Sequence, residues 1–344
     1  MRIAIATDAW SPQINGVVTT LQQTRDELVR QGHEVCMITP EGRRSMPCPT
    51  YPEIRLTLFA GSQIARELDA FDPECVHVAT EGPIGLIVRR YCIKRSLPFT
   101  TAYHTQFPEY VRARFPIPLS WTVALLRWFH GAADRTMVPT RSIRKVLEDR
   151  GFKNVVIWER GVLTDVFKPD DPVEYNLPGP IWVYVGRVSV EKNIEGFLDL
   201  DLPGTKLIIG DGPGRERLAE RYPDCEFLGY RFGRELARSQ AGCDVFVFPS
   251  KTDTFGIVML EAMACGLPVA AFPVTGPIDV VRPGETGILD SDLKRACERA
   301  LDLNPTACRK YAESRSWTRS TEQFVSHLTP KGGVAHPASG QHLA

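Results

Sequence analysis

The residues best suited to chemistry lie in one stretch, residues 248–266, where a buried strand ends and is followed by a loop and then a helix. The first backbone N–H groups of such a helix attract an anion, and here they belong to Gly256, Ile257 and Val258. Asp253 precedes the helix start and Glu261 lies inside it, so a phosphate bound there has one carboxylate on each side, spaced to accept hydrogen bonds from sugar hydroxyls. An N-cap plus a solvated helical Glu explains each residue singly, but not the arrangement.

Two cations follow another buried strand. Gly186 comes directly after the run IWVYV and lets the chain turn sharply, so that Arg187 and Lys192 can reach back over the strand end. This geometry suits the clamping of a diphosphate. The alternative is that both cations are ordinary solvated side chains.

Two further positions follow strands of the first half. Gly16, after Asn15, allows backbone N–H groups to approach an anion at a helix start, although a tight strand-to-helix turn explains it equally well. His104 ends the run TTAYHT, a place that favours a ligand cleft over a neutral core histidine.

Two other patterns are weaker. Asp199-Leu200-Asp201 has the D-x-D form of a Mg or Mn site, but it precedes a strand and so lies at the wrong end for a ligand. Gly210-Asp211-Gly212 resembles a dinucleotide fingerprint whose third Gly would fall at Arg215, so we interpret it as a turn. Arg187, Lys192 and a helix N-terminus can stabilise a leaving diphosphate without a metal. We therefore predict no metal and no cofactor, and activity that survives EDTA.

These residues are positioned by two series of short Val/Ile-rich runs, hydrophobic on both faces and separated by helical patterns, as in parallel sheets covered on both sides. The Pro- and Asp-rich segment 164–180 separates the series. The prediction is an α/β protein with two doubly wound, Rossmann-like domains facing each other across a cleft. The expected parts are residues 1–165, residues 166–328 with a closing helix at about 316–328, and a disordered tail, 329–344.

Composition excludes several classes of protein. The 344 residues include 41 basic and 41 acidic side chains, and a net charge of zero argues against a nucleic-acid binder. The nine cysteines form no C-x-x-C and are predicted to be reduced. No signal peptide and no membrane-spanning run is visible, so we expect a cytoplasmic protein.

One region is strongly basic. Residues 85–145 contain 11 Lys and Arg but only two acids, Glu109 and Asp134. Trp121, Leu125 and Trp128 recur at helical spacing within it, which predicts contact with an anionic membrane surface through residues 89–129. The alternative is that this stripe is the core face of an ordinary helix. The residues assigned to the patch are Arg89, Arg90, Lys94, Arg95, Arg112, Arg114, Phe115, Trp121, Leu125, Leu126, Arg127, Trp128 and Phe129.

The chain resembles the GT-B-fold retaining glycosyltransferases of family 4, which include bacterial lipid mannosyl-, glucosyl- and sulfoquinovosyltransferases. The likeness covers nearly the whole chain. It rests on the Pro-Gln-Ile-Asn-Gly loop ending at Gly16, the strand end Tyr103-His104-Thr105, Gly186-Arg187 with Lys192, and the acidic pair. The family pattern has Glu at both ends of the last motif, whereas this chain has Asp253 at the first, which leaves the donor sugar open.

The resemblance implies a role for each matched residue. Glu261 would hold the nucleotide ribose, Arg187 and Lys192 the diphosphate, and Asp253 with the adjoining loop (Thr254 and Phe255) the sugar. His104 would lie beside the reacting sugar, and Tyr230, after the strand CEFL, would offer backbone groups to the base, unless it belongs to an ordinary turn.

The function predicted is retaining transfer of a hexose from a UDP- or GDP-sugar to a hydroxyl acceptor. The expected acceptor is a membrane lipid such as diacylglycerol, at the inner face of the membrane, and a soluble sugar is the alternative acceptor. The alternatives are a GT-B epimerase or hydrolase of nucleotide sugars and a binding module without turnover. An NAD-dependent dehydrogenase is disfavoured because its fingerprint is missing.

Overall fold

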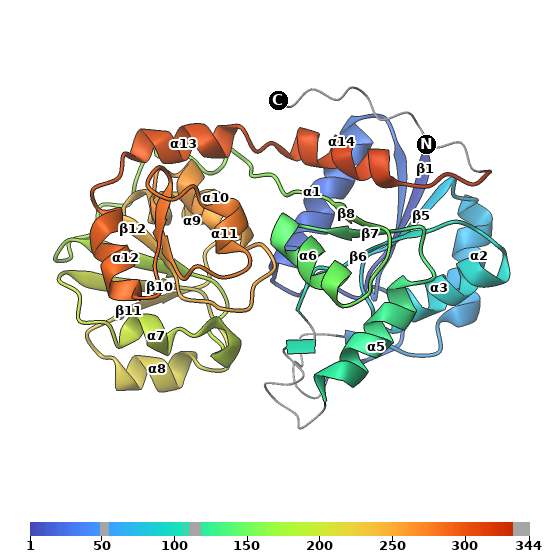
Figure 1. Cartoon of the computed structure of the whole chain (residues 1–344), viewed down its shortest axis with the longest axis horizontal. Coiled ribbons are helices and arrows are strands. Elements are labelled where there is room, and N and C mark those ends of the chain that lie inside the picture. The colour runs from blue at the N-terminus through green and yellow to red at the C-terminus, as the bar shows by residue number, and fades with distance from the viewer. Residues whose placement is uncertain (49–54, 107, 110–117, 333–344) are drawn as a thin grey trace. The chain divides into compact units, whose positions relative to one another are not determined.

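The computed structural model describes residues 1–48, 55–106, 108–109 and 118–332. The chain folds into two compact units. The first comprises Met1–Glu159 with the segment from Trp317 onward, and the second is Arg160–Ser316. Each unit is a parallel β-sheet with helices on both faces (Figure 1), as the sequence predicts.

The first unit is built around a six-stranded sheet in the order β2-β1-β5-β6-β7-β8, with a separate antiparallel pair β3-β4. Its strands are β1 (Arg2–Ala6), β2 (Glu34–Ile38), β3 (Ser45–Pro47), β4 (Arg55–Thr57), β5 (Cys75–Val78), β6 (Thr100–Ala102), β7 (Arg135–Val138) and β8 (Val155–Ile157). Its helices are α1 (Gly16–Arg30), α2 (Gly61–Phe71), α3 (Pro83–Lys94), α5 (Leu119–His130), α6 (Arg141–Asp149) and α14 (Trp317–His327).

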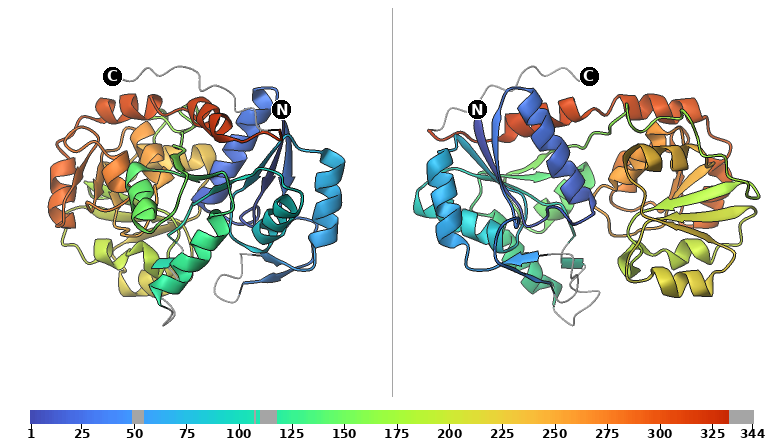
Figure 2. Two further views of the ribbon diagram at one scale, coloured as in Figure 1. Left: turned by 45° about the vertical axis from the view of Figure 1, so that its right-hand side comes forward. Right: turned by 180° about the vertical axis from the view of Figure 1, so that it is seen from behind.

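Alternate residues of β1 point to opposite layers. Ile3 and Ile5 pack with Leu21 of α1 and Phe324 of α14, whereas Ala4 lies in a separate core formed with α2 and α3. The helices α1 and α14 lie side by side, which Figure 2 shows from behind. Strands buried on both faces explain why the sequence shows continuous apolar runs rather than alternation.

The second unit has a six-stranded sheet in the order β11-β10-β9-β12-β13-β14. Its strands are β9 (Ile181–Val185), β10 (Thr205–Ile209), β11 (Glu226–Gly229), β12 (Val245–Phe248), β13 (Val269–Ala271) and β14 (Gly287–Leu289). Its helices are the 3₁₀ turn η1 (Val190–Lys192), α7 (Glu195–Leu198), α8 (Arg215–Arg221), α9 (Gly233–Ala241), α10 (Ile257–Ala264), α11 (Pro277–Val280), α12 (Leu293–Ala300) and α13 (Pro305–Glu313). The core on one face includes α9, α10 and α13, and the core on the other includes α7, α8 and α12.

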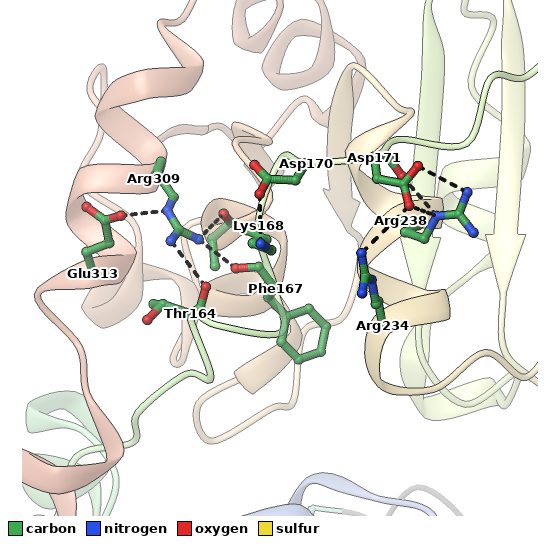
Figure 3. A network of polar contacts seen from close by, with 10 residues as sticks. Thr164, Phe167, Lys168, Asp170, Asp171, Arg234, Arg238, Arg309 and Glu313 are labelled. Carbon is green, nitrogen blue, oxygen red and sulfur yellow. Dashed lines mark hydrogen bonds and ion pairs between the residues drawn. The ribbon is translucent and has the colours of Figure 1, made fainter.

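The predicted connection, residues 164–180, packs onto the second unit. Arg309 of α13 donates hydrogen bonds to the carbonyl oxygens of Thr164 at 3.2 Å and Phe167 at 2.6 Å, and Arg238 of α9 pairs with Asp171 at 2.9 Å (Figure 3). These contacts stabilise the segment as part of the unit that begins at Arg160.

The closing helix differs from the sequence prediction. Residues 316–328 were expected in the second domain, but α14 packs on the first unit, because Phe324 and Leu328 bury their side chains beside Ile3, Ile5 and other residues of that core. Part of the predicted disordered tail, residues 333–344, lies outside the described residues. In the described part, the backbone N–H of Lys331 donates to the carbonyl oxygen of Glu74 at 2.7 Å.

Candidate active site

The second unit has its topological switch point between β9 and β12. From β9 the chain adds β10 and β11 on one side, and it then places β12, β13 and β14 on the other. Open α/β sheets bind ligands outside the carboxyl ends of their strands at such a point. The loops that leave β9 and β12, residues 186–193 and 249–256, are the two that the sequence singles out for a diphosphate.

Two contacts tie these loops together. Lys192 Nζ donates to Asp253 Oδ1 at 2.5 Å, and Asn193 Nδ2 donates to the carbonyl oxygen of Pro249 at 3.0 Å. The Lys192 and Asp253 side chains are only 22% and 15% exposed, so their attraction is screened less than that of a surface ion pair. The structure therefore brings the predicted diphosphate cation and the predicted sugar-contacting acid into direct contact.

The loop after β9 also packs against the loop after β10. Val188 N donates to the carbonyl oxygen of Asp211 at 2.9 Å. Gly210 has φ +142°, and a Cβ at this position would overlap the carbonyl oxygen of Gly186. The glycines of this run thus permit close approach of two backbones, which supports our interpretation of the run as a turn. Arg187, half-buried, follows Gly186 at the same edge of the sheet.

Gly256 sets the start of α10. Its φ is +79°, and a Cβ there would lie 2.8 Å from both Met259 Cε and Phe248 Cζ, so a larger residue would shift the first turn of the helix. As a glycine, the N-cap residue has no side chain that could cap α10. The side chains of Phe255 and Val258 pack against the core of the unit, so the contribution of these residues to an anion site is through the backbone.

Glu261 is a buried carboxyl within α10. The residue is 8% exposed, and burial raises its pKa from 4.5 to about 7. A buried carboxylate is costly unless hydrogen-bond donors approach it, and the hydroxyls of a ribose are such donors. The ribose-binding role of Glu261 stays a prediction that this burial supports.

Glu261 should make the stability of the protein depend on pH. Between pH 4.5 and about 7 the folded carboxyl keeps a proton that the unfolded chain has lost, so the free energy of unfolding falls as pH rises through this window. The full loss is on the order of 3 kcal/mol. We expect Glu261→Gln to raise the melting temperature more at pH 8 than at pH 5. Thermal unfolding at both pH values tests this, with the exposed Glu226→Gln as the control; equal shifts at the two pH values would contradict it.

Tyr230 follows β11 beside the same loops. The residue is 38% exposed, its ring stacks on Phe232 with ring centroids 5.6 Å apart, and its hydroxyl donates to the carbonyl oxygen of Asp211 at 3.4 Å. The expected base contact through the backbone of Tyr230 stays a prediction. Phe232, two positions on, contributes the second exposed ring of this pair, and the sequence analysis did not single it out.

Gly16 and His104 belong to the first unit. Gly16 begins α1, and Asn15 Oδ1 accepts hydrogen bonds from Val17 N and Val18 N, both at 3.0 Å. Two N–H groups of the helix start are therefore engaged by a side-chain cap, which favours the turn interpretation of this loop. His104 lies just after β6, half-buried, with its ring edge-on to Trp158 at 5.8 Å between centroids. Its place beside a reacting sugar stays a prediction.

Comparison with known proteins identifies the family. The model of glycosyltransferase family 4 matches residues 14–166, and that of the group 1 glycosyl transferases matches residues 179–303. A GDP-mannose-dependent alpha-mannosyltransferase of Mycobacterium tuberculosis (strain CDC 1551 / Oshkosh) is 33% identical, with 95% of this chain and 96% of the relative covered. The chain belongs to the family 4 glycosyltransferases.

Other similarities agree with this assignment. An alpha-monoglucosyldiacylglycerol synthase of Streptococcus pneumoniae is 26% identical, covering 94% of this chain and 83% of the relative. The fold is GT-B: the structure of sucrose-phosphate synthase from Thermosynechococcus elongatus superposes with a TM-score of 0.70 at 20% identity, covering 94% of this chain and 97% of that one. The resemblance inferred from the sequence is thus confirmed.

The exposed face of α5 is a second feature of this glycosyltransferase. Trp121 is 72% exposed, Leu125 55% and Trp128 54%, whereas Leu126 and Phe129, which lie off this stripe, are buried. The alternative that the stripe is a core face is therefore wrong. The assignment of Leu126 and Phe129 to the patch is also wrong, because both pack in the core.

The basic residues of the patch divide into two groups. Arg89 is buried: it donates to the carbonyl oxygens of Trp128 and Phe129, both at 2.9 Å, and joins α3 to the end of α5. Arg95 pairs with Asp69 at 2.9 Å. Arg90, Lys94 and Arg127 are exposed, and Arg112, Arg114 and Phe115 lie outside the described residues.

The D-x-D motif, Asp199-Leu200-Asp201, has both of its carboxylates on the surface. Asp201 pairs with Lys294 at 3.2 Å, and Asp199 accepts a hydrogen bond from Tyr222 at 2.5 Å. In the described ranges, no three His, Cys, Asp or Glu side chains gather as a metal site would require. None of the helices in these ranges has the length and apolar character needed to cross a bilayer.

Proposed function

We propose that this glycosyltransferase moves a hexose from a UDP- or GDP-sugar to a hydroxyl acceptor, with retention of configuration at the anomeric carbon. The observation that carries the proposal is the switch-point site of the second unit. There the Lys192–Asp253 pair, the start of α10 with its backbone N–H groups and the buried Glu261 follow neighbouring strands. A cation and a helix N-terminus suit a diphosphate, and the two acids suit sugar hydroxyls.

The chemistry proposed is a same-face substitution. The bond between the anomeric carbon and the phosphate oxygen breaks, the acceptor oxygen bonds to that carbon on the same face, and the acceptor proton passes to an oxygen of the leaving diphosphate. Negative charge grows on the diphosphate as the bond breaks. Lys192, Arg187 and the N–H groups at the start of α10 are the groups proposed to stabilise it.

A donor panel tests the proposal. The protein is incubated with UDP-, GDP- and ADP-sugars, with and without dioleoylglycerol in mixed micelles, and free nucleotide and products are measured. Acceptor-dependent nucleotide release with an α-linked product supports retaining transfer. Acceptor-independent release indicates a hydrolase, an isomerised donor indicates an epimerase, and a thermal shift without turnover indicates a binding module.

We expect transfer to survive EDTA, because Lys192, Arg187 and a helix terminus supply the positive charge that a bound Mg²⁺ would otherwise bring. Initial rates in excess EDTA should match those in excess MgCl₂ within a factor of two or so. Complete loss in EDTA, restored by Mg²⁺ or Mn²⁺, would contradict the prediction and return attention to Asp199 and Asp201.

A lipid is the acceptor that we propose, at the cytoplasmic face of the membrane. The support is the exposed apolar face of α5, the exposed cations Arg127 of α5 and Arg90 and Lys94 of α3 in the same unit, and the activity of the Streptococcus pneumoniae relative, a synthase of a glucosyldiacylglycerol. Aromatic and basic side chains together favour a lipid interface. In this proposal the first unit serves the acceptor and the second serves the donor.

A further inference from the structure

The first unit has its own switch point, between β1 and β5. The chain places β2 beside β1 on one side, and it then adds β5, β6, β7 and β8 on the other. Two acids lie just beyond the carboxyl ends of these two strands, Asp8 after β1 and Glu81 after β5. A ligand of this unit is expected at the carboxyl ends of these strands. What can bind there depends on which of the two carboxylates is free to accept a hydrogen bond from a ligand.

The carboxylate of Asp8 is fully occupied by hydrogen bonds within the protein. It accepts hydrogen bonds from Ile84 N at 2.9 Å, Gly85 N at 3.3 Å and Thr80 Oγ1 at 3.0 Å. The residue is 6% exposed, and burial raises its pKa to about 6. Asp8 therefore holds the start of α3 on the end of β1 and is not placed to meet a ligand.

Glu81 differs from Asp8. Its Oε1 lies 3.1 Å from His130 Nε2, and its side chain is 25% exposed. Across the described part of the chain, Oε2 receives no hydrogen bond from the protein. One oxygen of the carboxylate is thus fixed by His130, while the other is left for a further hydrogen bond, on a side chain that is partly exposed at the switch point.

His130 is itself held rigidly. Its ring is buried, with Nδ1 2.9 Å from Thr101 Oγ1, which in turn lies 3.2 Å from Thr136 Oγ1. Phe129 packs edge-on against the ring at 5.1 Å between centroids. Because a carboxylate only accepts, Nε2 carries the hydrogen toward Glu81. Hydrogen bonds from two strands therefore fix the orientation of one carboxylate.

Anchoring the end of α5 does not require this polar chain. Leu126 and Phe129 already bury that end in the core, and Arg89 binds two of its carbonyl oxygens. Buried polar groups are costly unless each of them makes its hydrogen bonds. A series of hydrogen bonds that ends in a partly exposed carboxylate therefore stabilises the fold less than an apolar contact would. What this series of hydrogen bonds does provide is an oriented hydrogen-bond acceptor at the carboxyl ends of the strands, where a ligand is expected.

We propose that Glu81 binds the hydroxyl-bearing headgroup of the acceptor and that His130 is its positioning residue. The proposal rests on the proposed function and deepens it by naming the acceptor class. A carboxylate accepts hydrogen bonds from uncharged hydroxyls and repels a phosphate. The site therefore selects a neutral polyol headgroup, such as that of a glycerolipid, over a phosphorylated one.

The test uses two soluble probes, 1-monooctanoylglycerol and octyl phosphate, whose binding to the full chain is measured by calorimetry. The wild type should prefer the neutral probe. Glu81→Gln keeps an oxygen that can accept a hydrogen bond from His130 but removes the charge. It should therefore weaken binding of the neutral probe about tenfold and reduce the discrimination against octyl phosphate. His130→Phe, which keeps a ring but loses both nitrogens, should reduce the preference in the same direction.

Glu148→Gln, which changes an exposed carboxylate on α6 paired with Arg144, is the matched control and should leave both affinities unchanged. If Glu81→Gln leaves the probe preference unchanged, with or without a lower melting temperature, Glu81 has only a structural role and the proposal is overturned. A wild type that binds neither probe overturns it as well. The assay needs no donor and no turnover. A chain that selects the neutral probe but releases nucleotide from no donor therefore fails the proposed function and not this inference.

Discussion

Lys192→Met should lower kcat/KM for the nucleotide-sugar donor by about a hundredfold or more, because it removes a charge that meets the leaving diphosphate in the transition state. Methionine retains much of the aliphatic stem and removes the ammonium group. The ammonium also pairs with Asp253 at 2.5 Å, so the substitution leaves a half-buried carboxylate without that partner. Nucleotide release under donor-limited conditions measures the effect.

The control separates the charge from the fold. Lys145→Met removes an exposed lysine from an ion pair with Asp149 on α6 and should leave both activity and melting temperature unchanged. The double variant Lys192→Met/Asp253→Asn removes both charges of the site pair. If Lys192→Met loses activity only because it leaves the Asp253 carboxylate without its ion partner, the double variant regains activity; if the Lys192 ammonium binds the donor, activity stays low. Wild-type activity in Lys192→Met would refute the site assignment.

The sequence predicted the fold well where strands are long and buried. Eight of the ten residues of β9 and β10 are aliphatic or aromatic, and the sequence predicts both strands. β14 was missed because Gly287–Leu289 is three residues long and gives no periodic pattern. The domain of α14 was predicted wrongly because an amphipathic helix shows that it has a buried face, and the sequence does not say which of two cores covers that face.

The candidate site likewise has parts that the sequence predicts and parts that it does not. Lys192 and Asp253 were both expected because each follows a strand, and the parallel sheet brings strand ends together. Their direct ion pair could not be predicted, since it depends on side-chain conformations in two loops 61 positions apart. Glu81 and His130 were missed because they are 49 positions apart and neither belongs to a recognisable motif. Arg89 was placed on the surface because charge alone does not reveal that it binds the carbonyl oxygens of a neighbouring helix.

The exposed face of α5 should bind the surface of an anionic membrane. The chain has six tryptophans, and Trp121 and Trp128 of α5 are the two that are exposed. The remaining four, at most 6% exposed, are Trp10, Trp158, Trp182 and Trp317. Because the other four indoles are buried, the quenching of tryptophan fluorescence by a lipid-bound quencher reports on this face of the folded protein. Wild-type fluorescence should therefore be quenched by vesicles of brominated phosphatidylglycerol at low salt, and less so at high salt.

Trp121→Ser/Trp128→Ser should abolish co-sedimentation with the same vesicles. Full insertion of an indole contributes about 2 to 3 kcal/mol, so losing two should weaken binding about a hundredfold or more. Phe59→Ser, which removes a ring that is 94% exposed elsewhere on the first unit, is the matched control and should pellet normally. Arg127→Gln should weaken binding at low salt only, because its contribution is electrostatic. If the wild type stays in the supernatant at low salt, or if the double variant pellets as well as the control, α5 is not the membrane-binding face. If in addition dioleoylglycerol accepts sugar from no donor, the lipid acceptor is excluded as well.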